Sequence, residues 1–365
     1  MKHQTTRYGE IPFYKIGTFG NTADAFISKK LFLEYKTKYS FPKKGDILIS
    51  ASGTIGRAVI YDGKPAYFQD SNIVWIDNDE TLVKNDFLFY AYSHVKWNTE
   101  HTTILRLYND NFRNTLIPLP PLNEQSAIAN ILSTLDRYLY NLDALILKKE
   151  SVKKALSFEL LGQRKRLKGF NQTWQRVRLG DICEFCNGGA YETLIVENGD
   201  FKLISLNSID IDGNLKNTMK RVNFYDNSLK QDDIVMVLSD VAHGDFLGLC
   251  AVIPSNDYVL NQRMGRLRIR NDCINILFLR LYINANQKYF KMQGQGSSQL
   301  NLSKKAIENF EIPLPPLNEQ SAIANILSGL DNEIISLKNK KRQFENIKKA
   351  LNHDLMSAKI RVLKK

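Results

Sequence analysis

Residues 117–136 read IPLPPLNEQSAIANILSTLD, and residues 312–331 read IPLPPLNEQSAIANILSGLD. At this offset of 195 residues the two stretches differ only where Thr134 stands against Gly329. The match continues at the same offset, since Leu160 lies opposite Leu355. A period of this length is too long for a solenoid, so it predicts a two-part module that is present twice.

Each copy of the repeat predicts a long helix after its prolines. Asn123 and Asn318 are the expected N-caps, and Glu124 and Glu319 follow near the positive end of the helix dipole. Apolar residues then recur at alternating steps of four and three over about five heptads, with two lysines per copy. The first series is Ile128, Leu132, Leu135, Leu139, Leu142, Ile146, Lys149, Lys153, Leu156 and Leu160, and the second is Ile323, Leu327, Leu330, Ile334, Leu337, Lys341, Phe344, Lys348, Leu351 and Leu355.

Such seams indicate two helices of about 40 residues, each roughly 60 Å long at 1.5 Å per residue. The two helices are expected to pair as a coiled coil. The alternative is that each seam docks on its own globular domain.

The sequence outside the helices has a different character. Residues 1–116 and 169–311 contain short β-branched or aromatic runs separated by Gly, Asp and Asn, which indicate strand-rich α+β domains. The expected order is a first domain at 1–116, a helical region at 117–168, a second domain at 169–311 and a second helical region at 312–365. Near-identical helix starts with divergent domains suit a scaffold that presents two readers of different specificity.

Composition fits a folded cytoplasmic protein. The 365 residues include 50 Lys+Arg and 38 Asp+Glu, a net charge of +12, and no run is long and apolar enough to span a membrane. Four cysteines are too few for a disulfide framework. The basic excess lies in 137–168 and 332–365, whereas the two domains are near neutral. Sequence discrimination, if present, is therefore expected from a few local groups.

The doubled IPLPPLNEQSAIANIL segment, each copy preceding a long helix and following a variable domain, resembles the specificity subunits of type I restriction-modification systems. The stretch from Trp174 to Gly189, WQRVRLGDICEFCNGG, is similar to the opening of that family's target-recognition domains. The resemblance extends over essentially the whole chain.

The resemblance implies a pseudo-twofold α+β architecture with two target-recognition domains joined by two antiparallel coiled-coil helices. Each domain reads one half of a split double-stranded DNA site, and the helices act as a ruler between the halves. The implied partners are two methyltransferase subunits, joined by restriction subunits for cleavage. We expect the contact with the methyltransferase near Pro120, Pro121, Asn123, Glu124, Gln125, Pro315, Pro316, Asn318, Glu319 and Gln320.

The first domain departs from the family pattern. Only 12 residues precede Phe13, whereas the matching Phe201 follows a longer stretch that begins at Trp174. The Leu-Gly-Asp-Ile opening is therefore lacking in the first domain. A truncated allele that reads one half-site is the alternative interpretation.

Base reading requires Arg, Lys, Asn or Gln in loops that can enter a groove. In the first domain the segments around Ser52–Arg57 and 67–72 offer such groups, and in the second domain 239–246 and 261–270 do so. The candidate DNA-binding residues are Thr54, Arg57, Tyr67, Gln69, Asn72, His243, Asn261, Gln262, Arg263 and Arg266.

Motifs for catalysis are absent from the sequence. Cys183 and Cys186 have metal-ligand spacing but no second pair, so packed thiols are expected in place of zinc. There is no methyltransferase motif, no grouped histidines and no Gly-rich cofactor loop, so we expect neither cofactor nor enzyme activity. The competing function is a coiled-coil scaffold with two protein-binding heads, which would bind DNA without sequence preference and with little salt dependence.

Overall fold

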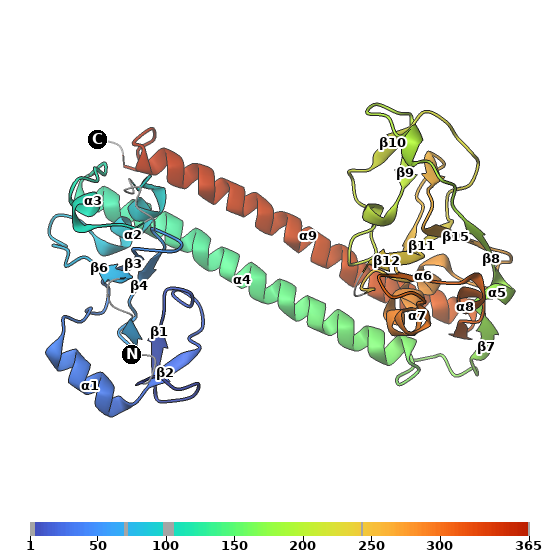
Figure 1. The fold of residues 1–365 in the computed structure, drawn as a ribbon, viewed down its shortest axis with the longest axis horizontal. Helices are drawn as coiled ribbons and strands as arrows, with labels where there is room; N and C mark the ends of the chain where they lie inside the picture. Colours follow the sequence, from blue (N-terminus) through green and yellow to red (C-terminus); the bar gives the residue numbers. More distant parts are fainter. Residues whose placement is uncertain (1–3, 69–71, 98–105, 242–243, 364–365) are drawn as a thin grey trace. The chain divides into compact units, whose positions relative to one another are not determined.

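The computed structural model describes residues 4–68, 72–97, 106–241 and 244–363 (Figure 1). Gln69 and His243, two of the candidate DNA-binding residues, lie outside the described residues. The chain divides into two compact units. Unit 1 comprises Met1–Leu145 and Lys338–Lys365, and unit 2 comprises Ile146–Leu337.

Two helices of 40 residues contribute to both units, as the repeat predicts. Helix α4 is Leu122–Leu161 and helix α9 is Leu317–Met356. Both end one or two residues before a left-handed residue, Gln163 after α4 and Ala358 after α9, again at the offset of 195. The expected N-caps are wrong by two residues. The helices begin before Asn123 and Asn318, and the carbonyls of Pro121 and Pro316 accept the first helical hydrogen bonds instead.

The two helices run antiparallel to each other within each unit. In unit 1 the ammonium group of Lys348 contacts Asp136, and in the same unit Lys341 lies 2.6 Å from Asp143. In unit 2 the ammonium of Lys149 lies 2.8 Å from Glu333, and Lys153 contacts Asp331. In each unit the residue number falls along α9 as it rises along α4, which defines an antiparallel pair. The four lysines that interrupt the seams are therefore paired with carboxylates of the facing helix.

Every residue of the two predicted seams is buried or half-buried. Towards the helix starts the seams also pack on the globular parts: Ile128 and Leu132 share a core with Phe87, and Leu327 belongs to a core with Phe278. Helix pairing and docking on a domain thus occur together, and the two interpretations of the seams do not exclude each other.

The residues of unit 1 that precede α4 form head 1. Its first sheet has the order β2-β1-β5, and its second has the order β4-β3-β6. Strand β1 pairs antiparallel with β2 and parallel with β5. The elements are β1 (Ile11–Tyr14), β2 (Ala25–Ile27), α1 (Lys29–Lys38), β3 (Ile47–Ser50), β4 (Ala58–Ile60), β5 (Tyr67–Phe68), β6 (Ile73–Trp75), α2 (Asn85–His94) and α3 (Asn109–Arg113).

The residues between α4 and α9 form head 2. Its sheets have the orders β10-β9-β14, β13-β11-β15-β8, β12-β16 and β17-β7. The elements are β7 (Gln175–Arg178), α5 (Leu179–Ile182), β8 (Cys183–Asn187), η2 (Glu192–Leu194), β9 (Phe201–Ile204), η3 (Leu206–Ser208), β10 (Lys220–Val222), β11 (Ile234–Val237), β12 (Ser239–Val241), β13 (Cys250–Val252), β14 (Tyr258–Leu260), β15 (Met264–Ile269), α6 (Ile276–Ala285), α7 (Gln287–Gln293), β16 (Gln299–Asn301), α8 (Lys304–Glu308) and β17 (Glu311–Leu314).

The two heads share one plan. Strand β9 pairs antiparallel with β10 and parallel with β14, as β1 does with β2 and β5. The buried strand β11 lies between β13 and β15, as β3 lies between β4 and β6. The duplication therefore includes the heads, although their sequences have diverged, and both are α+β as predicted. Within the described ranges, no helix is long and apolar enough to cross a membrane.

Candidate nucleic-acid interface and partner-binding helices

The first turn of each long helix holds a buried carboxylate. The Glu319 side chain is fully buried and accepts hydrogen bonds from Nε (2.8 Å) and Nη2 (2.7 Å) of Arg166, and from the indole Nε1 of Trp174 (3.0 Å). Glu124 accepts the equivalent pair from Arg361, with Nε at 2.7 Å, and a bond from the backbone N–H of Val362. The guanidinium of Arg361 lowers the pKa of Glu124. Both carboxylates thus anchor the chain that follows one long helix to the start of the other.

The next residue ties each helix to its head. The Gln320 side-chain oxygen accepts from the backbone N–H of Asn275 (2.7 Å), and its Nε2 donates to the carbonyls of Cys273 (3.0 Å) and Pro315 (2.8 Å). Since Asn275 is the N-cap of α6, Gln320 fixes the start of that helix. Gln125 makes the same contacts with Lys84, Leu82 and Pro120, at the start of α2.

These contacts correct the predicted partner surface. Glu124, Gln125, Glu319, Gln320 and Pro315 are buried, so their side chains hold the fold together and are not available to a partner. Pro120 and Pro316 are half-buried. Of the ten predicted contact residues, only Pro121, Asn123 and Asn318 are exposed. Sequence repetition could not separate a repeated internal contact from a repeated surface.

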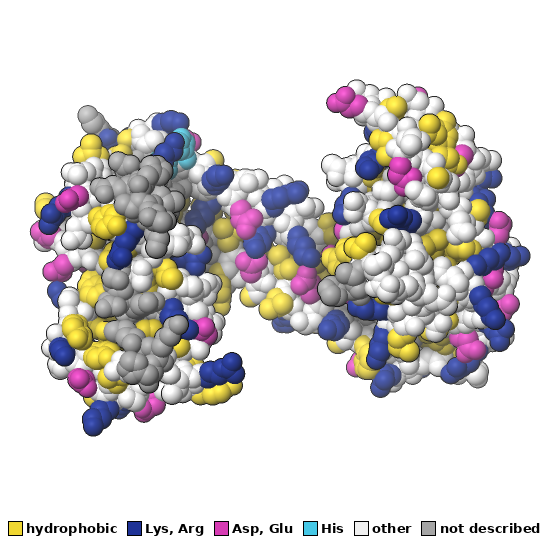
Figure 2. Space-filling model, in the orientation of Figure 1, with side chains coloured by type: hydrophobic (Ala, Val, Ile, Leu, Met, Phe, Trp, Pro, Cys, Tyr) yellow, Lys and Arg dark blue, Asp and Glu magenta, His cyan; other side chains and the backbone are white. Residues whose placement is uncertain are grey.

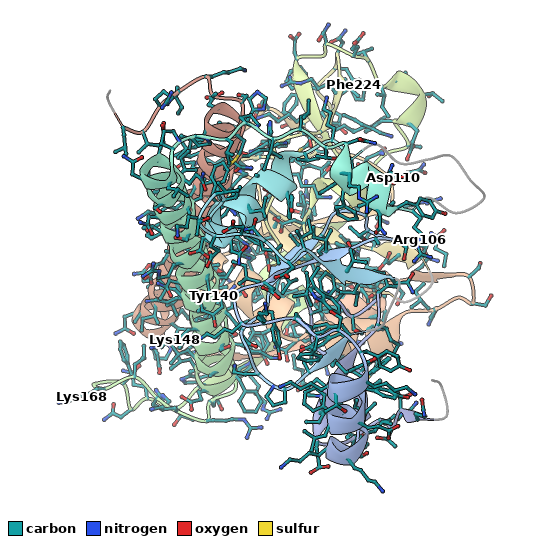
Figure 3. The ribbon with its side chains drawn as sticks, turned by 90° about the vertical axis from the view of Figure 1, so that its left-hand side faces the viewer. Arg106, Asp110, Tyr140, Lys148, Lys168 and Phe224 are labelled. Atoms are coloured by element: carbon teal, nitrogen blue, oxygen red, sulfur yellow. The ribbon has the colours of Figure 1, made fainter. Side chains whose placement is uncertain are left out.

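Exposed apolar residues on the long helices repeat at the offset of 195. Tyr140 on α4 is 74% exposed, and its equivalent Ile335 on α9 is 43% exposed (Figure 3). In the face shown in Figure 2, basic and acidic side chains are interspersed along the helices. The matched exposed pairs are Leu122 with Leu317, Ile131 with Ile326, Tyr140 with Ile335 and Val152 with Ile347. Their positions off the seam in both copies are a sequence signal that the repeat analysis missed.

Head 2 has a polar cleft beside the loop between β14 and β15. Its volume is about 150 Å³, and it is lined by Glu192, Ser205, Leu206, Asn207, Lys220, Asn261, Gln262 and Arg263. The structure therefore brings three candidate DNA-binding residues together in one place, and it adds acidic and basic groups that were not predicted.

Asn261 shapes this cleft from below. It is buried, its side-chain oxygen accepts from the backbone N–H of Tyr191 (3.0 Å), and its Nδ2 donates to Glu192 Oε1 (3.0 Å). Hydrogen bonding from Gln262 is the main cause that lowers the pKa of Glu192. Glu192 is therefore an exposed, ionised acceptor. Arg263 is exposed and has a left-handed backbone (φ 68°), which turns the loop at this point.

Arg266 does not belong to this surface. It is only 7% exposed, donates from Nη2 to Glu184 (2.7 Å) and from Nη1 to the carbonyl of Ser228 (3.0 Å). It thereby links β15 to β8. Its neighbour Arg268 forms a two-pronged ion pair with Asp233. The alternating arginines of β15 are therefore structural.

The candidates in head 1 do not gather in a described cleft. Tyr67 is 7% exposed and stacks on Phe13 with ring centroids 5.9 Å apart, so it belongs to the core. Thr54 and Arg57 are exposed, and the Arg57 side chain donates to the carbonyl of Phe19 (2.9 Å). Asn72 is half-buried and accepts from the hydroxyl of Ser52 (2.8 Å).

The cysteines are free thiols. Cys183 and Cys250 are buried, and burial raises the pKa of the Cys183 thiol to about 12. In the part of the chain that the structure describes, no group of three or more His, Cys, Asp or Glu side chains could hold a metal ion.

These features define a class of internally duplicated proteins in which two mixed α+β heads are each tied to the start of one of two paired long helices. The sequence matches the family described as the type I restriction modification DNA specificity domain over residues 1–149 and 171–346. The chain belongs to this family and is a specificity subunit of a type I restriction-modification system.

Relatives are similar over most or part of the chain. The MjaVIII type I restriction enzyme specificity subunit of Methanocaldococcus jannaschii is 28% identical over 93% of this chain and 84% of that protein. S.HindORF215P of Haemophilus influenzae is 65% identical over 133 residues, and the match spans 36% of this chain and only 34% of that protein. The crystal structure of the S subunit from M. genitalium has a TM-score of 0.67 at 20% identity, covering 98% of this chain and 91% of that one, and so shares the fold.

Proposed function

We propose that this specificity subunit reads a bipartite double-stranded DNA target in the cytoplasm, with one half-site for each head, and that it carries no chemistry itself. Methylation and cleavage belong to two methyltransferase subunits and to restriction subunits that assemble on it. One observation supports this most directly: the ion pairs and glutamine contacts that attach a head to a long helix occur twice, at one constant offset. A duplicated attachment with divergent heads suits the reading of two different half-sites.

The cleft of head 2 is the proposed base-reading site. Arginine reads guanine by donating to O6 and N7, whereas a carboxylate accepts from the N4 amino group of cytosine. Arg263 and Glu192 supply these two groups on the rim of one cleft, and Gln262 lies between them in the same lining. Because Glu192 stays ionised, it repels phosphate and favours an amino group as its partner. We therefore assign a G·C pair to the half-site of head 2.

The long helices are proposed to position the two heads and to bind the partners. A helix of 40 residues is about 60 Å long, enough to set a fixed spacing between half-sites. The proposed methyltransferase surfaces are the matched apolar positions Ile131 with Ile326 and Tyr140 with Ile335, since exposed apolar side chains that recur at one offset present two equivalent patches. The segments 117–168 and 312–365 are accordingly the helical regions between readers 1–116 and 169–311.

The test is the methylated motif of the complete complex with Arg263→Ala. Loss of a two-pronged arginine contact costs about 1–3 kcal/mol of base discrimination, so one position of one half-site should relax while the other half-site is unchanged. Arg270→Ala is the matched control, because Arg270 is an exposed arginine of the same head that does not line the cleft. Sequencing of methylated DNA measures both.

A motif that is unchanged by Arg263→Ala would reject the assignment of the cleft. Methylation without any bipartite motif that depends on this chain would reject the function, and DNA binding without sequence preference or salt dependence would favour the protein-binding scaffold. A motif with only one specified half would favour the reading of a single half-site.

A further inference from the structure

The central sheets of the two heads are the same up to one strand. Ile49 of β3 lies opposite Val74 of β6, and in the same register Met236 of β11 lies opposite Gly265 of β15. In head 2 the outer edge of β15 is paired along its length with β8, from Gly265 opposite Asn187 to Ile269 opposite Cys183 (Figure 1). In head 1 the equivalent strand β6 is an edge, and none of the residues that the structure describes pairs with it there.

A second pairing is also confined to head 2. Strand β17, which leads into α9, pairs antiparallel with β7. The equivalent residues 116–119, which lead into α4, form no strand with any described part of head 1. The segment β7-α5-β8 thus covers one continuous face of head 2, and the same face of head 1 has no such cover among the described residues.

The uncovered face of head 1 is apolar. Leu267 of β15 is 1% exposed, whereas its equivalent Ile76 is half-buried. Leu314 of β17 is 8% exposed, but its equivalent Leu119 is 55% exposed, and the adjacent Leu116 is 93% exposed. An apolar face beside an unpaired strand edge is a template for another strand.

We propose that a strand from another polypeptide chain adds to β6 of head 1. Head 2 shows what such an occupant requires. It runs antiparallel to the edge, and it places apolar side chains inward at alternate positions, as Cys183 and Phe185 do, while Glu184 and Cys186 face outward. A preceding turn buries two more apolar residues, as Leu179 and Ile182 do in α5. Main-chain hydrogen bonds would supply affinity, and the alternate side chains specificity.

A synthetic peptide with the sequence of residues 172–190 is the probe, since this segment covers the equivalent face in head 2. It is added to the full-length chain, and amide hydrogen exchange is followed separately in β6 and β15. We expect exchange in β6 to slow about tenfold or more at saturating peptide, with β15 unchanged. The control peptide carries Val177→Pro and Phe185→Pro, which remove the donors that strand pairing needs, and it should have no effect.

Three results would overturn the proposal. The first is unchanged exchange in β6 at millimolar peptide. The second is slowing that the proline peptide reproduces. The third is protection of β6 that appears without peptide as the chain is concentrated, together with a dimer in sedimentation, because the edge would then pair with a second copy of itself. None of these readouts depends on DNA recognition, so the outcome is independent of the proposed function.

Discussion

Units 1 and 2 contain nearly the same 20 residues at the start of a long helix, and they use them in the same way. In each unit the glutamate binds an arginine and the glutamine fixes the first helix of the head. The surroundings differ. Glu319 is fully buried and has Trp174 as a third donor, whereas the Arg361 partner of Glu124 is 51% exposed. Identical sequence therefore gives identical contacts, while the surrounding head decides how much solvent each contact meets.

The largest expected effect breaks this comparison at the carboxylate. Glu319→Ala leaves the Arg166 guanidinium and the Trp174 indole without their acceptor and should cost unit 2 about 3 kcal/mol, because removing one partner of a buried pair strands the other. Glu124→Ala should destabilise unit 1 less, since water reaches Arg361. Urea unfolding followed by hydrogen exchange in each unit measures both, and Glu197→Ala, an exposed acid in unit 2, is the control. Equal losses in the two units would show that solvent exposure of the arginine does not matter.

Sequence reasoning predicts the helices well because their signal is periodic and local. The seams, the helix lengths and the duplication all follow from spacing, and every seam residue is buried or half-buried. The same reasoning misplaces Glu124 and Gln125 on a partner surface, because the partners that bury them, Arg361 and Lys84, are distant in sequence. A repeated motif signals a repeated contact but not whether that contact is internal.

The candidate DNA-binding residues show a similar division. Asn261, Gln262 and Arg263 were found as a polar run between apolar strands, and they line one cleft. Arg266 was included because it continues the run of arginines, yet its side chain is directed to Glu184 on β8, a pairing set by sheet topology. Glu192 was missed because it reaches the cleft from about 70 residues earlier in the chain. Residues that meet only through the fold leave no local signal.

A second comparison concerns the matched apolar residues of the helices. Ile131→Glu and Ile326→Glu each place a charge on one of two equivalent patches, so each should weaken the binding of one methyltransferase subunit about tenfold and leave the other bound. Native mass spectrometry of the complex counts the subunits. Asn141→Glu, at an exposed polar position of α4, is the control. Loss of both subunits from either single variant would mean that the two patches are not independent.

The smallest expected effect concerns the ion pairs between the helices. Lys153 with Asp331 in unit 2 is the equivalent of Lys348 with Asp136 in unit 1, and both pairs are partly shielded from solvent. Lys153→Asp places two carboxylates together and should cost about 1 kcal/mol, and adding Asp331→Lys should recover most of it because the pair is restored with its partners exchanged. Urea unfolding of the four variants gives the coupling energy, and the same cycle at Lys348 and Asp136 is the matched comparison. In unit 1 the hydroxyl of Tyr90 also donates to Asp136 (2.8 Å), so the exchanged pair should recover less there. Equal recovery in both units would show that the contact between head and helix adds nothing to the register of the two helices.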